Sequence, residues 1–396
     1  MINNDKLEKY IESLNINSDN IFLKKKILSE CNKSNYSIDK TIYYLDFVFD
    51  VVRNMNLKIN DIDLFLSDSH NFGLAVSRVR TSKNKILYIK PKSIHSSLYL
   101  NYIIRGIFNN NFLLESNIIN INKDFSIEED IPFNKPLPIK NFSIACGRLL
   151  ALLFFLDGRD MHLNNFTINR FGFPQIIDSE TLFHNNIPRD FFSKQKDYYR
   201  ENIFSKTPLI LGMLPQSHTY KGITYEESGI KGLFMKISKQ YNYNYIFEKN
   251  IEHIILGFEL GFNEILEKKN FLLSVYPLFV TRHILRPTKF YETLIEEITL
   301  LPNKEERMYF LKNTLDFSKK RNNNYMWIVE REIEELLNFD IPIFTTSPVD
   351  TAIYIRKNKL KNFFKESSFI RLKNMIFQHS SSDVKKHIKV IKWSAI

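Results

Sequence analysis

The sequence has little of what would place it among secreted, zinc-binding or membrane proteins. It contains only two cysteines in 396 residues, too few for a disulfide framework or a zinc site made of four thiolates. Its start, MINNDKLEKY, lacks the apolar core of a signal peptide. The longest apolar run, around Leu149 to Leu156, is far shorter than the roughly 20 residues that cross a bilayer. We therefore expect a cytoplasmic protein without a membrane span.

Glycine-rich phosphate-binding motifs are also missing. Neither GxGxxG nor GxxxxGK[ST] occurs, which excludes a phosphate cradle of either familiar kind. Lys and Arg total 55 against 44 Asp and Glu, a net charge of +11. This excess favours an acidic partner, such as a phosphate-bearing cofactor, an acidic peptide or nucleic acid, but a solvated basic surface explains it as well. Because no basic stripe is interleaved with aromatic residues, we do not expect nucleic acid.

Apolar and aromatic residues are abundant, at 44% and 14% of the chain, which indicates a globular protein throughout. The length exceeds that of a usual single core and predicts two lobes or two joined domains. In residues 1–66, apolar residues recur with largely helical spacing and predict an N-terminal helical cap. The runs GLAVSRVR and KILYIK, separated by TSKN, predict a β-hairpin that ends at Lys90. A helix is expected from about His95 to Phe108, and the proline-rich IPFNKPLPIK is expected to be a hinge.

The second half of the chain predicts a buried helix followed by polar loops. The segment NFSIACGRLLALLFFL is apolar nearly all round, as in a buried helix. It leads into DGRDMHLNNF, then into two strand-like runs near residues 166–168 and 175–177, and then into Asp178. From Phe247 to about Leu337 helical spacing dominates, with a basic interruption at TRHILRPTKFY. Together these patterns predict an α+β fold whose C-terminal part is mainly helical.

One set of polar residues matches the needs of phosphoryl transfer. Asn165 follows Asp160 by five residues, and Asp178 follows Asp160 by eighteen. Phosphoryl transfer needs a carboxylate to accept the hydroxyl proton, an amide oxygen on a metal ion, and a second carboxylate that bridges metal and phosphates. The interval from Asp160 to Asn165 matches the protein-kinase catalytic loop, and DMHLNN is similar to the loop of lipid-kinase relatives. Lys90 stands where a kinase places its phosphate-binding lysine.

Taken singly, each of these features has an ordinary explanation. An isolated DxHxxN is usually a polar surface loop, and Lys90 alone could be an exposed residue at a strand end. TRHILRPTKFY alone could be a basic helix end made rigid by Pro287. Their order along the chain is what favours function.

Seven segments resemble, in order, the dehydratase domain of class II lanthipeptide synthetases. They are SDSHNFG, YIKPKS, GRLLALLFFLDGRDMHLNN, PQIIDSETLF, GMLP, TRHILRPTKFY and EIEELLNFDIPIF, which span roughly residues 66 to 350. FSIEEDIPF also aligns with an aromatic-Glu motif of that family, although the usual Trp is absent. The resemblance implies a two-lobed protein- or lipid-kinase-like fold, with the helical cap at 1–66, the N-lobe at 67–140 and the C-lobe at 141–396.

The resemblance also implies an activity and its residues. The expected enzyme uses ATP and Mg²⁺ to phosphorylate Ser or Thr of a ribosomal precursor peptide with a leader, then eliminates the phosphate to leave dehydroalanine or dehydrobutyrine. By motif, Lys90 binds the nucleotide phosphates, Asp160 acts on the hydroxyl, His162 supports the phosphate, and Asn165 with Asp178 holds Mg²⁺, assisted by Glu180. Asp68 and His70 match a pair near the same phosphates, and Arg282 and Thr288 match a pair that acts in elimination.

Elimination also has physical requirements of its own. A phosphate leaves only if its charge is stabilised, and the Cα proton needs a base. TRHILRPTKFY supplies Arg282, His283, Arg286 and Lys289 within eight residues, and an arginine can hold phosphate oxygens bidentately.

Three functions remain open. The first is a stand-alone dehydratase, without a cyclase domain since no Cys/Cys/His cluster occurs. It works beside a separate cyclase protein or leaves the dehydro residues open. The second is a peptide kinase that stops at the phosphate. The third is an inactive subunit that binds the precursor peptide.

Overall fold

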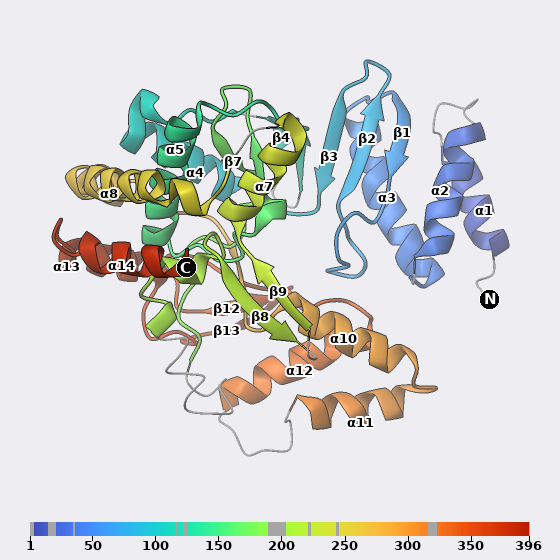
Figure 1. Cartoon of the computed structure of the whole chain (residues 1–396). Helices are drawn as coiled ribbons and strands as arrows, with labels where there is room; N and C mark the ends of the chain where they lie inside the picture. The colour runs from blue at the N-terminus through green and yellow to red at the C-terminus, as the bar shows by residue number, and fades with distance from the viewer. Residues whose placement is uncertain are drawn as a thin grey trace.

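The computed structural model combines helices with small antiparallel sheets, as Figure 1 shows. The residues described are 4–14, 21–34, 36–115, 117–121, 125–188, 203–220, 223–242, 245–315 and 323–395. The expected mixture of α and β structure is therefore confirmed, while the two-lobed kinase-like arrangement stays a prediction. Within these residues, no helix has both the length and the apolar character needed to span a membrane.

The N-terminal part joins three helices to a five-stranded sheet. The helices are α1 (Asn4–Ser13), α2 (Ile21–Lys33) and α3 (Ile38–Asn54). The strands are β1 (Ile59–Asp63), β2 (Ser77–Thr81), β3 (Ile86–Lys90), β4 (Ile118–Ile121) and β5 (Ser126–Glu129), in the order β1-β2-β3-β5-β4. Helices and sheet share one core, in which Ile27, Val48 and Val79 are fully buried. The helical spacing was expected to reach Leu66, but INDID forms β1 instead and buries Ile59 and Ile62.

The predicted hairpin and the predicted strand end at Lys90 are both confirmed. β2 and β3 pair antiparallel, with Ser77 opposite Ile89. On its other side β3 pairs with β5, where Lys90 lies opposite Ser126. Lys90 is thus the last residue of the central strand, and the chain leaves the sheet there toward the larger body of the molecule (Figure 1).

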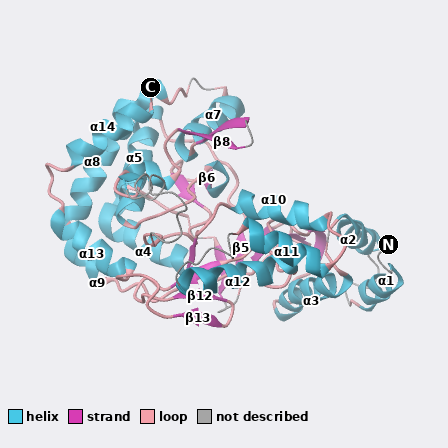
Figure 2. Cartoon of the chain, turned by 90° about the horizontal axis from the view of Figure 1, so that it is seen from below, coloured by secondary structure: helices cyan, strands magenta, loops and turns pink. Residues whose placement is uncertain are grey.

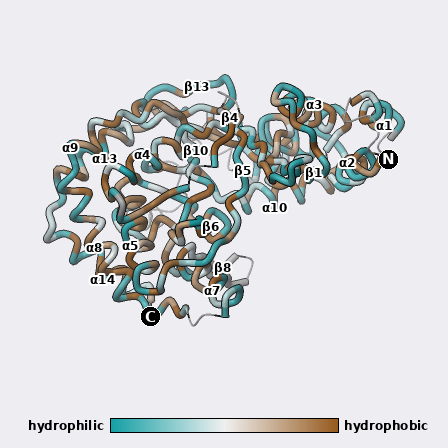
Figure 3. Tube along the Cα trace, turned by 90° about the horizontal axis from the view of Figure 1, so that it is seen from above, coloured by the Kyte–Doolittle hydropathy of each residue, from teal (hydrophilic) through white to brown (hydrophobic). Residues whose placement is uncertain are grey.

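The larger body is built around the buried helix that the sequence predicted. This helix, α5 (Ile139–Phe155), packs along α8 (Ile251–Glu267), with α4 (His95–Phe108), α9 (Lys269–Ser274), α13 (Ser368–Gln378) and α14 (Val384–Ser394) around them. Hydrophobic segments run through the interior of this body, where α5 lies (Figure 3). Leu150, Leu152 and Phe155 of α5 are fully buried on different sides of the helix. The segment IPFNKPLPIK precedes α5 without regular structure up to Pro138.

Two glycines allow α5 and α8 to approach very closely. A Cβ atom added to Gly147 would lie 2.0 Å from the carbonyl oxygen of Ile254, and one added to Gly257 would lie 2.1 Å from that of Ile144. Both obstacles are backbone atoms, so they cannot move without shifting a helix. The catalytic-loop motif follows α5 directly, and the depth of α5 in the core therefore fixes where that loop begins.

We expect Gly147→Ala to destabilise the protein by about 1–3 kcal/mol, the usual cost of overpacking a core. Urea denaturation followed by circular dichroism measures this change. Gly158→Ala is the matched control, since a Cβ there meets its nearest neighbour at 3.4 Å, an ordinary contact. Equal denaturation midpoints for the two variants would contradict the close helix crossing.

Further elements lie between α4 and α8 along the chain. They are η1 (Asn109–Asn111), η2 (Leu163–Asn165), β6 (Phe166–Ile168), β7 (Pro174–Ile176), η4 (Pro208–Leu211), β8 (Gln216–Tyr220), β9 (Ile223–Glu227), α7 (Gly229–Tyr241) and η5 (Glu248–Asn250), of which only η1 comes before α5. The strands β6 and β7 form the second predicted hairpin, with Phe166 opposite Ile176.

The C-terminal third adds three helices and a four-stranded sheet. The helices are α10 (Thr288–Thr299), α11 (Lys304–Thr314) and α12 (Asn323–Leu337). The sheet has the order β10-β11-β12-β13 and consists of β10 (Thr281–His283), β11 (Phe344–Thr346), β12 (Ile353–Ile355) and β13 (Asn358–Leu360). The basic interruption of the helical pattern is therefore β10 followed by the start of α10. Helices α10, α11 and α12 pack on one another, and Figure 2, seen from below, shows them as one group.

A buried ion pair joins the N-terminal helices to the C-terminal third. Lys40 of α3 donates to Asp340 over 2.6 Å and to the carbonyl oxygen of Asn338 over 2.9 Å. Asp340 is fully buried and also accepts hydrogen bonds from the hydroxyl of Ser69 and the backbone N–H of Phe72. Ser69 and Phe72 both belong to the segment SDSHNFG. The ion pair of Lys40 and Asp340 therefore holds that segment between α3 and the residues after α12.

Candidate active site

The loop that contains Asp160 is held in shape by its own side chains. Asp160 has a φ of 59°, a left-handed conformation that costs a non-glycine residue free energy and is often found in active sites. Asn165 donates its side-chain N–H to the carbonyl oxygen of Asp160 over 2.7 Å. His162 Nδ1 accepts from the backbone N–H of Asn164, which leaves Nε2 3.6 Å from Asp160 Oδ1. The three predicted residues of this loop thus form one cluster.

The β6–β7 hairpin returns the chain to the same loop. Ile177 donates its backbone N–H to the carbonyl oxygen of Asn165 over 2.9 Å. The next residue is Asp178, whose Oδ1 accepts the backbone N–H of Glu180 over 3.2 Å. Asp178 and Glu180 therefore lie beside the Asp160 loop because of backbone pairing, not through their own charges.

Lys90 reaches this cluster from the N-terminal sheet. Its ammonium donates to Glu128 Oε2 over 2.8 Å and to the carbonyl oxygen of Ile177 over 3.0 Å. The second contact is one residue away from Asp178, so the N-terminal sheet meets the end of the β6–β7 hairpin there. Only 13% of the Lys90 side chain is exposed, which argues against an ordinary surface lysine. Glu128 was not singled out from the sequence, although its segment, FSIEEDIPF, was noticed there.

Lys92 also belongs to this cluster, although no pattern in the sequence singled it out. Its ammonium lies between two carboxylates, 2.5 Å from Asp178 Oδ2 and 2.9 Å from Glu180 Oε2. Lys92 lies two residues after Lys90, where the chain bends just past the end of β3.

The predicted elimination residues join the same cluster. Arg282 donates to Glu180 Oε1 over 3.0 Å and to Thr288 Oγ1 over 3.2 Å. The backbone N–H of Arg282 also donates to the carbonyl oxygen of Glu180 over 2.7 Å. Strand β10 supplies Arg282 and the first residue of α10 supplies Thr288. The two residues of this pair are therefore in direct contact.

Asp68 and His70 lie on the Arg282 side of the cluster. Burial raises the pKa of Asp68 and Glu292 adds to the shift, while the positive charges of Arg282 and Lys289 oppose it. Burial lowers the pKa of His70 to about 4, and the charge of Arg282 acts in the same direction. His70 is therefore neutral near pH 7, and its Nδ1 must carry the proton because it lies 2.9 Å from the carbonyl oxygen of Ile341.

The pKa values of Glu180 and Asp160 are shifted in opposite directions. Burial alone would raise the pKa of Glu180, but Lys92 and Arg282 outweigh burial and hold that pKa well below its ordinary value. For Asp160 burial wins: it raises the pKa, and the attraction of His162 and Arg282 only partly offsets it. Glu180 is thus a permanent anion, and Asp160 is the stronger base of the two.

The oxygen atoms of this cluster suit a hard divalent cation. Asp178, Glu180 and the amide of Asn165 offer the oxygen ligands that Mg²⁺ prefers. The Lys92 ammonium lies between the carboxylates of Asp178 and Glu180 and pairs with both. No group of three or more His, Cys, Asp or Glu in the described part of the chain is placed to hold a metal by itself. Mg²⁺ commonly binds through one or two carboxylates together with substrate phosphates.

One protein family matches most of the chain. The model of a family described as "Domain of unknown function (DUF4135)" matches residues 45–246 and 238–347. This family is found in class II lanthipeptide synthetases. Among curated proteins none matches the chain. The matched stretches contain every residue of the cluster described above.

Proposed function

Because the chain belongs to the DUF4135 family, we propose that it dehydrates Ser and Thr of a ribosomal precursor peptide by ATP-dependent phosphorylation and subsequent elimination of phosphate. The observation that carries this proposal is the position of Glu180. One of its oxygens pairs with Lys92 and the other with Arg282. Residues expected for phosphorylation and residues expected for elimination therefore share one carboxylate.

In the first half-reaction, the hydroxyl oxygen of the peptide attacks the γ-phosphorus of ATP. The bond from phosphorus to the ADP oxygen breaks, and the hydroxyl proton passes to Asp160. The raised pKa of Asp160 supports this role, because a stronger base accepts a proton more readily. Lys90, fixed by Glu128, binds phosphate oxygens of the nucleotide as a point charge. His162, 3.6 Å from Asp160, lies where it can donate to the transferred group.

Mg²⁺ would be held by Asp178, Glu180 and the amide oxygen of Asn165, and it would neutralise charge on the phosphates. The chain prepares this position with Lys92, whose ammonium keeps the two carboxylates close together. Without a cation between them, these two half-buried carboxylates would repel each other.

In the second half-reaction, a base removes the Cα proton, the Cβ–O bond breaks and inorganic phosphate leaves as the Cα=Cβ bond forms. Arg282 stabilises the departing phosphate, since a guanidinium can hold two of its oxygens. Thr288 positions Arg282 through the hydrogen bond of 3.2 Å. His70, which is neutral, and Asp68 lie on the Arg282 side of the cluster, next to the departing phosphate.

The arrangement of the elements supports a two-lobed kinase-like fold. A five-stranded antiparallel sheet ends its central strand in Lys90. Then follow a helix, a hinge segment, a buried helix, the loop of Asp160, a β-hairpin and Asp178. This is the order of a kinase N-lobe and C-lobe, with the helices α1 to α3 packed on the smaller lobe.

The proposal is tested by incubating the protein with ATP, Mg²⁺ and a leader-containing precursor peptide encoded beside its gene. We expect a loss of about 18 Da for each modified residue, which is the removal of water after phosphoryl transfer. Omission of ATP, or addition of EDTA, should leave the peptide mass unchanged. A stable gain of about 80 Da would identify a kinase that stops at the phosphate. No change in mass, with binding of the peptide retained, would instead identify an inactive binding subunit.

A further inference from the structure

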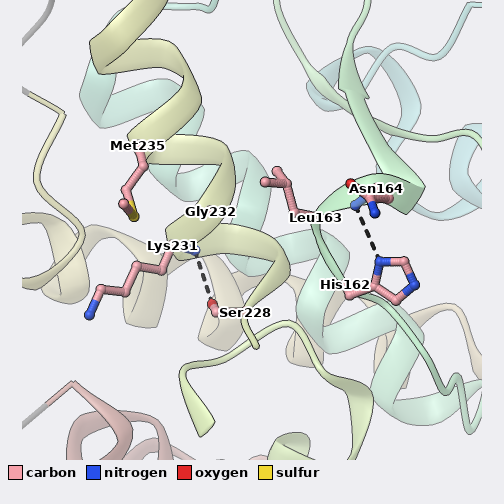
Figure 4. Close-up of a pocket in the computed structure, with 7 residues that line it drawn as sticks. All are labelled: His162, Leu163, Asn164, Ser228, Lys231, Gly232 and Met235. Carbon is pink, nitrogen blue, oxygen red and sulfur yellow. Dashed lines mark hydrogen bonds between the residues drawn. The ribbon is translucent and has the colours of Figure 1, made fainter. Parts of the chain in front are cut away.

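A pocket adjoins the Asp160 loop on the side of helix α7. It encloses about 740 Å³ and is lined by His162, Leu163, Asn164, Ser228, Lys231, Gly232 and Met235, shown in Figure 4. This size lies in the range of pockets that hold small ligands. His162 lines the pocket and also lies 3.6 Å from Asp160, so the pocket is continuous with the candidate active site.

Two glycines allow helix α7 to approach the Asp160 loop closely. A Cβ atom on Gly229 would lie 2.4 Å from the carbonyl oxygen of Met161, and one on Gly232 would lie 3.1 Å from Leu163 Cβ. Figure 4 shows Leu163 pointing toward α7 from the opposite wall. The helix therefore forms a rigid wall of the pocket, and the distance between this wall and His162 is fixed by packing.

The helix start in this pocket is not built for an anion. Its first N–H groups are all used inside the protein: Gly229 donates to Gly212, Ile230 to Met213, Lys231 to the hydroxyl of Ser228 and Gly232 to the carbonyl oxygen of Ser228. The ammonium of Lys231 forms an ion pair with Glu248 over 3.1 Å. Because these donors are engaged, the pocket does not offer the ready donors of a phosphate site.

The remaining walls are apolar, with an exposed polar rim. Leu163, Gly232 and Met235 provide the apolar surface, and 64% of Met235 is exposed. A large exposed apolar side chain beside a catalytic loop can gain free energy by covering an apolar ligand. Asn164 is exposed at the rim, where its amide can bond to an extended peptide backbone.

We propose that this pocket binds an uncharged, apolar side chain of the substrate peptide next to the Ser or Thr that is modified. The inference rests on the proposed function, because it assumes that a peptide hydroxyl reaches Asp160. When that hydroxyl lies at Asp160, the neighbouring residue meets the wall formed by His162 and Leu163. The pocket would then select modified positions by the residue beside them.

Photo-crosslinking tests this proposal without relying on catalysis. The probe is a short synthetic peptide with one Ser and with photo-leucine on either side of it, irradiated with the full chain, ATP and Mg²⁺. We expect crosslinks at Leu163 or Met235, found by mass spectrometry of tryptic fragments. Met235→Trp should fill the pocket and reduce these crosslinks about tenfold, the loss expected when an apolar side chain no longer fits its pocket. Leu256→Trp is the control, at an exposed apolar position of α8 outside the pocket.

Crosslinks that miss α7 and η2, or that persist in Met235→Trp, would overturn the proposal. The mass of the peptide that has not been crosslinked is measured in the same samples, to detect phosphorylation or dehydration. A peptide that is dehydrated without crosslinking to the pocket removes this inference alone. A pocket crosslink supports the binding site whether or not the short peptide is modified, and the leader-containing precursor peptide tests the proposed function separately. Circular dichroism checks that Met235→Trp is folded. We expect it to be, because Met235 is exposed and substitutions at exposed positions usually change stability little.

Discussion

Replacement of Asp178 by Asn should abolish both the phosphorylated and the dehydrated product, with a fall of roughly a thousandfold in the rate of peptide modification. The substitution keeps the shape of the side chain but removes the charge that faces Lys92 at 2.5 Å and that would hold Mg²⁺. Since the first half-reaction supplies the phosphate for the second, losing one ligand stops both. Mass spectrometry of the peptide measures the loss.

The fold of this variant should survive, because Glu180 still pairs with Lys92 at 2.9 Å. Binding of Mn²⁺, followed by electron paramagnetic resonance, gives a readout that does not depend on turnover and should weaken in the variant. Asp61→Asn is the matched control, since Asp61 also pairs with a lysine, Lys26, at 2.7 Å but lies on the N-terminal sheet. Normal dehydration by Asp178→Asn would refute the role of this carboxylate in phosphoryl transfer.

The elements closest to the site were the ones that the sequence predicted best. The hairpin that ends at Lys90, the helix His95–Phe108, the buried helix α5 and the hairpin before Asp178 all formed as expected. Each has a strong local signal: alternation with a polar turn, or an apolar run of helical length. Their order also made it reasonable to expect Lys90 near Asp178, and the bond from Lys90 to the carbonyl oxygen of Ile177 agrees with that expectation.

The contacts that join distant segments were beyond sequence reasoning. Lys92 and Asp178 are separated by 86 positions, and Lys90 and Glu128 by 38, and neither pair has a local pattern. The same holds for the pair of Lys40 and Asp340, 300 positions apart. Ion pairs of this kind follow from tertiary packing, which composition and periodicity do not encode. Strand β10 was missed as well, because three residues are too few to show alternation.

The two halves of the site also differ in how they are held. Lys90 and Lys92 come from the end of the N-terminal sheet, whereas Arg282 and Thr288 come from β10 and the start of α10. Glu180 touches cations from both sources. A substitution on one side can therefore spare the other, provided that Glu180 keeps at least one positive partner. The kinase and elimination activities should on this argument be separable by mutation.

Replacement of Arg282 by Ala should separate them and cause the phosphorylated peptide to accumulate. Elimination should slow by about 10²–10³-fold, the usual cost of removing one group that stabilises developing negative charge. Phosphorylation should continue, because Lys92 still neutralises Glu180. The expected mass spectrum shows a gain of about 80 Da per modified residue in place of a loss of about 18 Da.

A synthetic phosphoserine peptide isolates the second half-reaction, since it needs no ATP. The native protein should release inorganic phosphate from this peptide, and Arg282→Ala should not. Arg148→Ala is a close control: its side chain is 14% exposed against 16% for Arg282, and it too pairs with a glutamate at 3.0 Å, but between α5 and α8. If Arg282→Ala releases phosphate as fast as this control, the leaving group is stabilised by another cation. If instead neither product forms, Glu180 depends on Arg282 as well as on Lys92, and the two activities share one inseparable site.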